Sequence, residues 1–215
     1  MRMNNIQRIY YDVEQFYNKN YNKYDLINKF YCRHDNTLTW HKYERHICNG
    51  SYINEYQWIN NNNQYSFIIG DGHCVQLYYE YNSNDELVKA NLAFWPNISE
   101  NFSESDYVRF DCDVDSHKDY VHTSYHAHFG YNSSSRISIY RFPMPIEFLN
   151  FIIVQYFNNL LSNYEIGKIK SVKNSCISTL DDLGHLYTTH LRVWIYRKSF
   201  SKFMHLIFCW RFALP

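Results

Sequence analysis

From Tyr65 onward, the chain alternates apolar and polar residues with a period of two, and short turn sequences interrupt this alternation repeatedly. The pair Asp71-Gly72 separates two such segments and is typical of a tight β-hairpin turn. Further turns are expected at 82–85 and at 133–135. Consecutive short strands joined by turns predict an antiparallel meander, with strands at residues 65–69, 73–81, 86–95, 107–113, 119–129 and 136–142.

Helical periodicity flanks the predicted sheet on both sides. Apolar residues recur every three or four positions over about residues 3–19, which predicts an amphipathic helix, and a second short helix is expected at 25–31. After Pro143 and Pro145, an apolar stripe that continues to Leu161 predicts a helix that packs across the meander. The expected fold class is α+β: a twisted antiparallel β-meander of about five to seven strands packed against a long helix, with an N-terminal helix.

The length of the chain fits a single domain that spans residues 1–215. Its expected parts are a helical N-terminal part at 1–31, an antiparallel sheet at 35–142, a packing helix at 143–163 and a C-terminal part at 164–215. The pattern of the last part is weak. Within it, apolar residues at positions 203, 206, 207 and 210 share one helical face, which predicts a short helix docked on the domain.

Charge and hydropathy exclude several classes of protein. Lys and Arg together number 21, as do Asp and Glu, so no global field draws the chain to nucleic acid or to a membrane. No run approaches the roughly 20 apolar residues that span a bilayer, and we expect no secretory signal at the start. We therefore expect a cytoplasmic protein with no membrane partner, whose six cysteines, which form no CxxC pair, are free thiols.

Two neighbouring strands of the predicted sheet carry most of the reactive side chains. Arg109, Asp111 and Asp113 stand at alternate positions, as do His122, Ser124, His126 and His128. Successive side chains of a strand point to opposite faces, so each set shares one face of its strand. The two strands adjoin in an antiparallel hairpin. We therefore expect Asp111 or Asp113 within reach of an imidazole, which it would orient and make more basic.

These residues suit more than one chemistry. In the first interpretation, one of His126 and His128 is a general base and the other a general acid, with His122 beside them, and Asp111 orients one ring. Arg109, with Arg136 or Arg141, would then stabilise the charge on a phosphate, and Tyr125 would belong to a substrate-binding surface of arginines and aromatic rings. This interpretation needs no cofactor. Alternatively, His126, His128 and Asp111 bind a divalent metal ion, or the histidines simply decorate the solvated face of a strand.

Five segments in a fixed order resemble a bacterial family of unknown function, domain-of-unknown-function family 2290. They are QLYYEY (76–81), LAFWP (92–96), YVRFD (107–111), DYVHTSYHAHFG (119–130) and RFPMPIEFLNFI (141–152). The resemblance covers roughly residues 35–165 and implies no activity, because none is assigned to the family. More loosely, Arg-Phe-Asp, then His-x-x-x-His-x-His, then a Pro-x-x-Phe helix looks like the layout of a small toxin family of toxin–antitoxin pairs, which implies nucleic-acid chemistry and an antitoxin partner.

Three functions follow from these observations. The first is a phosphodiester-cleaving, RNase-like bacterial toxin or phage-defence effector. The second is a non-catalytic module that binds RNA, a nucleotide or a protein partner through its His, Arg and Tyr residues. The third is a metal-dependent hydrolase built on the same residues. Distances separate them, because an acid and a base must flank one phosphate, whereas metal ligands must converge on a point about 2 Å from each donor atom.

Overall fold

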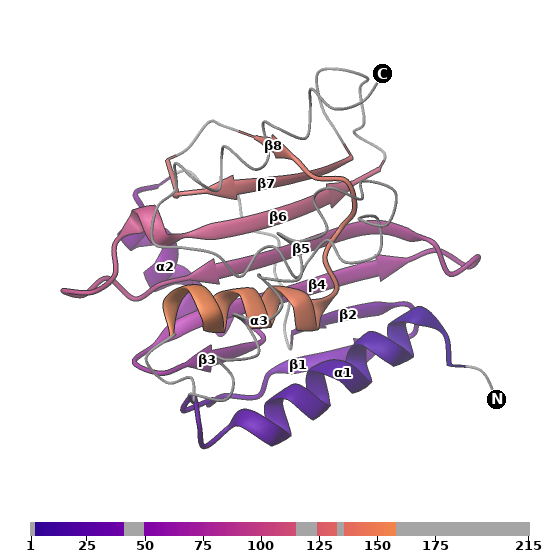
Figure 1. Cartoon of the computed structure of the whole chain (residues 1–215), viewed down its shortest axis with the longest axis horizontal. Coiled ribbons are helices and arrows are strands. Elements are labelled where there is room, and N and C mark those ends of the chain that lie inside the picture. Colours follow the sequence, from indigo (N-terminus) through magenta and orange to yellow (C-terminus); the bar gives the residue numbers. More distant parts are fainter. Residues whose placement is uncertain (1–2, 41–49, 115–123, 133–135, 158–215) are drawn as a thin grey trace, which may run out of the picture. The chain divides into compact units, whose positions relative to one another are not determined.

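The computed structural model describes residues 3–40, 50–114, 124–132 and 136–157, and these contain one antiparallel sheet of eight strands. Its order is β1-β2-β4-β5-β6-β7-β8, and β3 pairs with β4 beside this path (Figure 1). Neighbours in this order from β4 to β8 are consecutive in the chain, so the predicted antiparallel meander is confirmed. The strands are β1 (Tyr31–His34), β2 (Thr37–Trp40), β3 (Phe67–Ile69), β4 (His73–Tyr81), β5 (Leu87–Trp95), β6 (Val108–Asp113), β7 (Tyr125–Phe129) and β8 (Ile137–Ser138).

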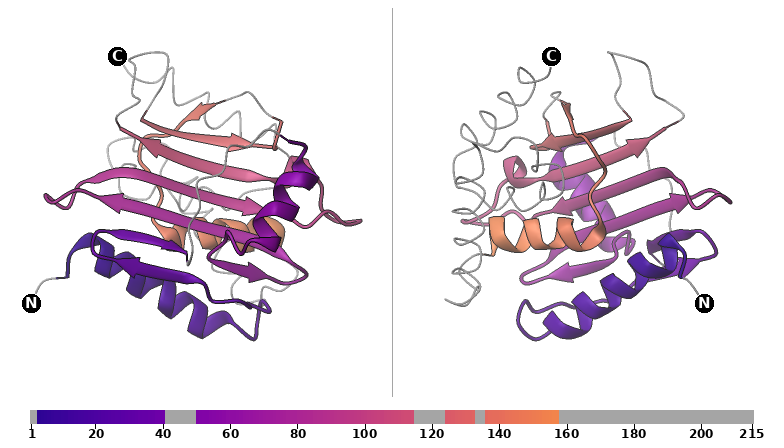
Figure 2. Two further views of the ribbon diagram at one scale, coloured as in Figure 1. Left: turned by 180° about the vertical axis from the view of Figure 1, so that it is seen from behind. Right: turned by 45° about the vertical axis from the view of Figure 1, so that its right-hand side comes forward.

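Within the described residues of the N-terminal unit, which extends to Ile146, two α-helices flank this sheet. They are α1 (Asn5–Asn20) and α2 (Tyr52–Asn61), and a 3-10 turn, η1, covers Glu104–Asp106. The two α-helices lie on opposite faces of the sheet, as Figure 1 and the reverse view in Figure 2 show. None of the helices in the described residues is long and apolar enough to cross a membrane.

Helix α1 confirms the predicted N-terminal helix, and its start is set by the side chains of Asn4 and Gln7. Asn4 Oδ1 accepts a hydrogen bond of 2.9 Å from the Gln7 amide, and Gln7 Oε1 accepts one of 3.2 Å from the Asn4 amide, which makes a capping box. Asp85, in the turn between β4 and β5, accepts bonds of 3.0 and 3.2 Å from the amide of Asn5. A carboxylate at this position also stabilises the helix, because its negative charge lies beside the positive end of the helix dipole.

The N-terminal part of the chain contains two departures from the sequence prediction. The short helix expected at 25–31 is absent: Asp25 and Asn28 have positive φ angles of 47° and 56°, which an α-helix cannot contain, and β1 already begins at Tyr31. In contrast, α2 lies inside the range that was predicted to be sheet only. The side chain of Ser51 caps it by accepting a bond from the amide of Asn54.

The hairpin predicted at Asp71-Gly72 is confirmed between β3 and β4. Gly72 has a φ angle of 99°, which a residue with a Cβ atom adopts only under strain. The long strands β4 and β5 then form the centre of the sheet. Three cysteines in the described residues, Cys32, Cys74 and Cys112, form no disulfide bond.

Two neighbouring cross-strand rows, which point to opposite faces of the sheet, differ in polarity. On one face, Leu77, Leu92, Phe110 and Ala127 lie opposite one another across β4 to β7, and all four are buried. The neighbouring cross-strand row points to the other face and consists of Tyr78, Asn91, Asp111 and His126. Strand alternation thus places a continuous polar row directly behind the apolar core.

The last described helix, α3, runs from Pro145 to Tyr156 and belongs, from Glu147 onward, to a second unit of the chain. It confirms the helix expected after Pro143 but is shorter than the predicted range 143–163, of which residues 158–163 lie outside the described residues. Leu149 and Ile152 on its apolar stripe are fully buried. The packing of this helix across the sheet, the organisation into a single domain and the predictions for 164–215 stay predictions.

Candidate functional site

The candidate site is built from two adjacent cross-strand rows on the face of the sheet that carries Asn91 and Asp111. Asp111 of β6 lies opposite His126 of β7, and Arg109 lies opposite His128. Both pairs therefore point to the same side, as the alternation of the sequence predicted. The antiparallel pairing of β6 with β7 thus brings a carboxylate, a guanidinium and two imidazoles together from one hairpin.

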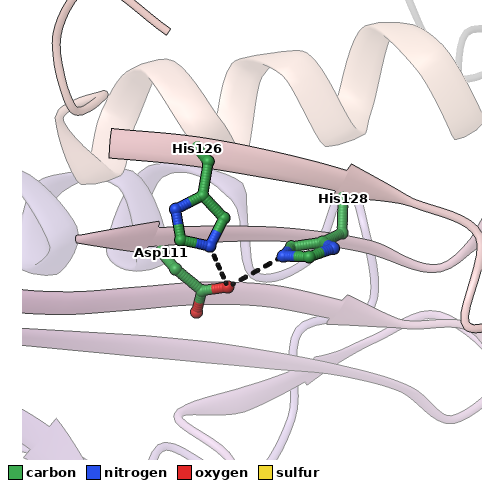
Figure 3. A group of neighbouring side chains, drawn as sticks. All are labelled: Asp111, His126 and His128. Atoms are coloured by element: carbon green, nitrogen blue, oxygen red, sulfur yellow. Dashed lines mark ion pairs between the residues drawn. The ribbon is translucent and has the colours of Figure 1, made fainter. Parts of the chain in front are cut away.

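The side chains of Asp111, His126 and His128 converge on one another (Figure 3). The Nε2 atoms of both histidines lie 3.5 Å from the same oxygen, Oδ2 of Asp111. One potential ligand atom from each of the three residues can be chosen so that all three lie within 4.8 Å of one another. The two rings meet edge to face with their centroids 5.1 Å apart. This arrangement presents three donor atoms to a single small volume.

Two further side chains fix the orientation of the Asp111 carboxylate. Arg109 Nε donates a hydrogen bond of 2.8 Å to Oδ2, and Asn91 Nδ2 donates one of 2.7 Å to Oδ1. Both carboxylate oxygens are therefore engaged, and Oδ2 is turned toward the histidines. Although burial opposes it, the neighbouring Tyr107 and Asp111 raise the pKa of Arg109, so its guanidinium stays charged. Asn91 is a site residue that the sequence analysis missed.

The histidines are buried, which corrects the expectation that they lie on a solvated face. His126 is 4% exposed and His128 is 8% exposed. One reason is that β8 pairs with β7, so β7 is not an edge strand, and each imidazole also shields the other. Burial, together with the positive charge of Arg109, lowers the pKa of His128 to about 4, although Asp111 opposes this change. His128 is therefore a neutral imidazole at pH 7, and simple decoration of a wet surface is excluded.

A pocket of about 370 Å³ opens beside this cluster. Asp111 and His126 line it together with three cationic side chains, those of Lys89, Arg109 and Arg136. Trp40, Tyr78 and Asn91 also contribute to its wall. The sequence pointed to Arg109 and Arg136 for this surface but not to Lys89 or Trp40, which come from other strands and are brought here by the register of the sheet.

Two of the other residues proposed from the sequence, Tyr125 and Arg141, are not brought to this cluster. Tyr125 points to the opposite face of β7, where its ring lies 6.3 Å from that of Phe142. Arg141 is exposed and is not among the residues that line the pocket. His122 lies outside the described residues. The backbone of Asp113 pairs with that of Lys89 at the end of β6, and nothing further is described for its side chain.

Comparison with known protein families identifies the family of this chain. The family model DUF2290, described as an uncharacterized conserved protein, matches residues 25–189, which is more than half of the chain. This confirms the resemblance found in the sequence and extends it on both sides. No curated protein and no solved structure matches the chain. The looser likeness to toxins receives no support from these comparisons.

Proposed function

We propose that this chain, which belongs to the DUF2290 family of uncharacterized conserved proteins, is a phosphodiester-cleaving hydrolase whose catalytic residues are Asp111, His126 and His128. One observation carries the proposal. Three cationic side chains, from Lys89, Arg109 and Arg136, line the same pocket as the Asp111–His126 pair.

The charge of the pocket favours an anionic substrate. Its lining contains three cations but a single carboxylate, Asp111, which already accepts a hydrogen bond from Arg109. The whole chain has no net charge, so this excess of positive charge is local. Guanidinium groups match the geometry of phosphate oxygens, and fixed cations stabilise the charge that develops when a phosphoryl group is attacked.

Hydrolysis needs an activated water molecule as well as charge stabilisation. A water oxygen bonds to phosphorus, the bond from phosphorus to the ester oxygen breaks, and one water proton passes to the leaving oxygen. We assign the activation of that water to the cluster of Asp111, His126 and His128, because two of its members, Asp111 and His126, line the pocket. The two imidazoles do not flank a phosphate, because both Nε2 atoms approach the same oxygen of Asp111. The distances therefore disfavour the expected pairing of one histidine as acid with the other as base.

The wall of the pocket also favours nucleic acid over other phosphodiesters. Trp40 and Tyr78 line it with the cations, and aromatic rings beside cations are the usual surface for single-stranded RNA. Within this proposal, the protein is an RNase-like toxin or phage-defence effector that acts on RNA in the cytoplasm and is neutralised by a protein partner. Induced expression in a bacterial host should then arrest growth, and the Asp111→Asn variant should not.

The test is cleavage of single-stranded RNA and of bis(p-nitrophenyl) phosphate by the purified chain. Lys89→Ala and Arg136→Ala should raise KM by about tenfold each, since each removes one exposed cation from the pocket. Lys19→Ala and Arg33→Ala, which remove exposed cations elsewhere, serve as matched controls and should leave KM unchanged. Binding of RNA without cleavage would replace the hydrolase with a binding module. Neither binding nor cleavage of either substrate would overturn the proposal.

A further inference from the structure

We infer that Asp111, His126 and His128 form a binding site for one divalent transition-metal ion. The inference deepens the proposed function, because a metal ion would supply the activated water that the two histidines are badly placed to generate by themselves. Metal binding can be measured without a substrate, so the two proposals can fail separately.

The distances between the donor atoms fit one ion. Zinc lies about 2.0–2.2 Å from nitrogen and carboxylate ligands, so two ligands of one ion are about 3–3.5 Å apart in tetrahedral or octahedral geometry. Oδ2 of Asp111 lies 3.5 Å from each Nε2 atom. The three donors thus need only small rotations to reach a common ion (Figure 3). An acid–base pair would instead leave room for a phosphate between the rings.

The ligands are held before any ion arrives. All three stand on paired strands, where backbone register fixes their spacing. Asn91 and Arg109 hold the two carboxylate oxygens by hydrogen bonds, which is the role of the outer shell in metal sites. While it accepts the bond from Arg109, Oδ2 stays 3.5 Å from Nε2 of each histidine.

One atom of the site is otherwise unexplained. Nε2 of His128 is buried and has no hydrogen-bond partner among the described residues, although it lies 3.5 Å from Oδ2 of Asp111. Buried polar atoms without a partner are rare in folded proteins and cost free energy. A metal ion between His128 and Asp111 would give this nitrogen the partner that it lacks.

The donor set also restricts the identity of the ion. Two imidazoles and one carboxylate suit zinc, iron, manganese and cobalt, whereas magnesium and calcium favour ligands that are all oxygen. Three protein ligands leave at least one coordination position for water, which is typical of catalytic rather than structural sites. The pocket beside Asp111 and His126 gives a substrate access to that position. Bound water would become acidic enough to act as a nucleophile near neutral pH.

The experiment is a calorimetric titration of the full chain, stripped of metal with a chelator, with Zn²⁺, Mn²⁺ and Mg²⁺. We expect one Zn²⁺ or Mn²⁺ per chain and no saturable binding of Mg²⁺. His126→Ala, His128→Ala and Asp111→Asn should weaken binding by more than the about 10–100-fold that loss of an outer-shell partner causes, and Asn91→Ala should fall within that range. Circular dichroism of each metal-free variant shows whether it is folded. If a histidine variant is unfolded, Asp111→Asn still tests the site, because it keeps the shape of the side chain.

His34→Ala is the matched control. His34 lies 3.3 Å from Sγ of Cys32, so it is the natural place for zinc to bind adventitiously. This control should keep the stoichiometry and the affinity of the wild type. Undiminished binding by folded Asp111→Asn, or absence of saturable binding by the wild type, would overturn the inference. RNA cleavage that persists in chelator would overturn the role of the metal ion in activating water while leaving the hydrolase standing. Metal binding without cleavage of either substrate would overturn the hydrolase while leaving the metal site standing.

Discussion

Asp111→Asn should lower the free energy of unfolding of the metal-free protein, even though it changes almost nothing in volume. Both carboxylate oxygens accept hydrogen bonds, from Arg109 at 2.8 Å and from Asn91 at 2.7 Å. An amide has only one acceptor oxygen. Whichever way it turns, its NH₂ group faces another donor, and the attraction of Arg109 to a full negative charge is lost.

The size of this loss follows from the exposure of the two partners. A hydrogen bond to a charged group contributes about 1.5–3 kcal/mol when it is well shielded. The side chain of Asp111 is 20% exposed and that of Arg109 is 36% exposed, so solvent screens their attraction in part. We therefore expect a loss of about 1–2 kcal/mol.

A double-mutant cycle with Asn91→Ala separates this local effect from a general loss of stability. Without the Asn91 amide, no donor remains on that side of position 111. The side-chain amide of the Asp111→Asn variant can then turn its NH₂ group to that side and its oxygen toward Arg109. Asp111→Asn should then cost at least about 0.5 kcal/mol less than it does in the wild type. The assay is urea unfolding in chelator, followed by tryptophan fluorescence. Equal costs in both backgrounds, or a fully stable single variant, would refute the proposed orientation of the carboxylate.

Three further predictions concern the scaffold. Asp85→Ala should destabilise the protein by about 0.5–2 kcal/mol in urea unfolding, because it removes the carboxylate bound to the amide of Asn5 at the start of α1, and Ser83→Ala in the same turn is the control. Leu149→Ala should destabilise it by about 2–5 kcal/mol, because this side chain is fully buried, and a loss below 0.5 kcal/mol would contradict that burial. His73 lies 4% exposed, and burial lowers its pKa to about 4 although Asp71 opposes this. In the unfolded chain His73 takes up a proton near pH 6.5, whereas in the folded chain it stays neutral until about pH 4. The free energy of unfolding should therefore fall by up to about 1.4 kcal/mol per pH unit as the pH drops from 6.5 toward 4. His73→Gln should make this fall shallower.

Local signals determined which parts of the fold the sequence predicted. The β3–β4 hairpin depends on a turn that Asp71-Gly72 encodes within two residues, and α1 depends on apolar spacing within one segment. Helix α2 was missed because it is rich in Asn, which has low helix propensity, and because it interrupts a region of strands. The helix expected at 25–31 failed because Asp25 and Asn28, which tolerate positive φ angles, turn the chain instead.

The features of the candidate site also divide into those that local sequence encodes and those that depend on how the strands pair. Parity along each strand predicted that His126 and His128 share one face of β7 and that Arg109 and Asp111 share one face of β6. That the two sets lie on the same face of the sheet depends on the register between β6 and β7, which pairs Asp111 with His126. The contribution of Asn91 depends on the register between β5 and β6, and the segment from Pro96 to Tyr107 that joins them does not encode it. The burial of the histidines depends on what pairs with β7 and on the packing of the two rings. Neither can be read from the alternation of polar residues.

Anomalous diffraction from a zinc-soaked crystal of the full chain tests the central claim most directly. We expect a single well-occupied peak about 2.0–2.2 Å from Oδ2 of Asp111 and from Nε2 of both His126 and His128, with Asn91 and Arg109 still bound to the carboxylate. A crystal in which zinc occupies other residues and leaves this cluster empty would contradict it.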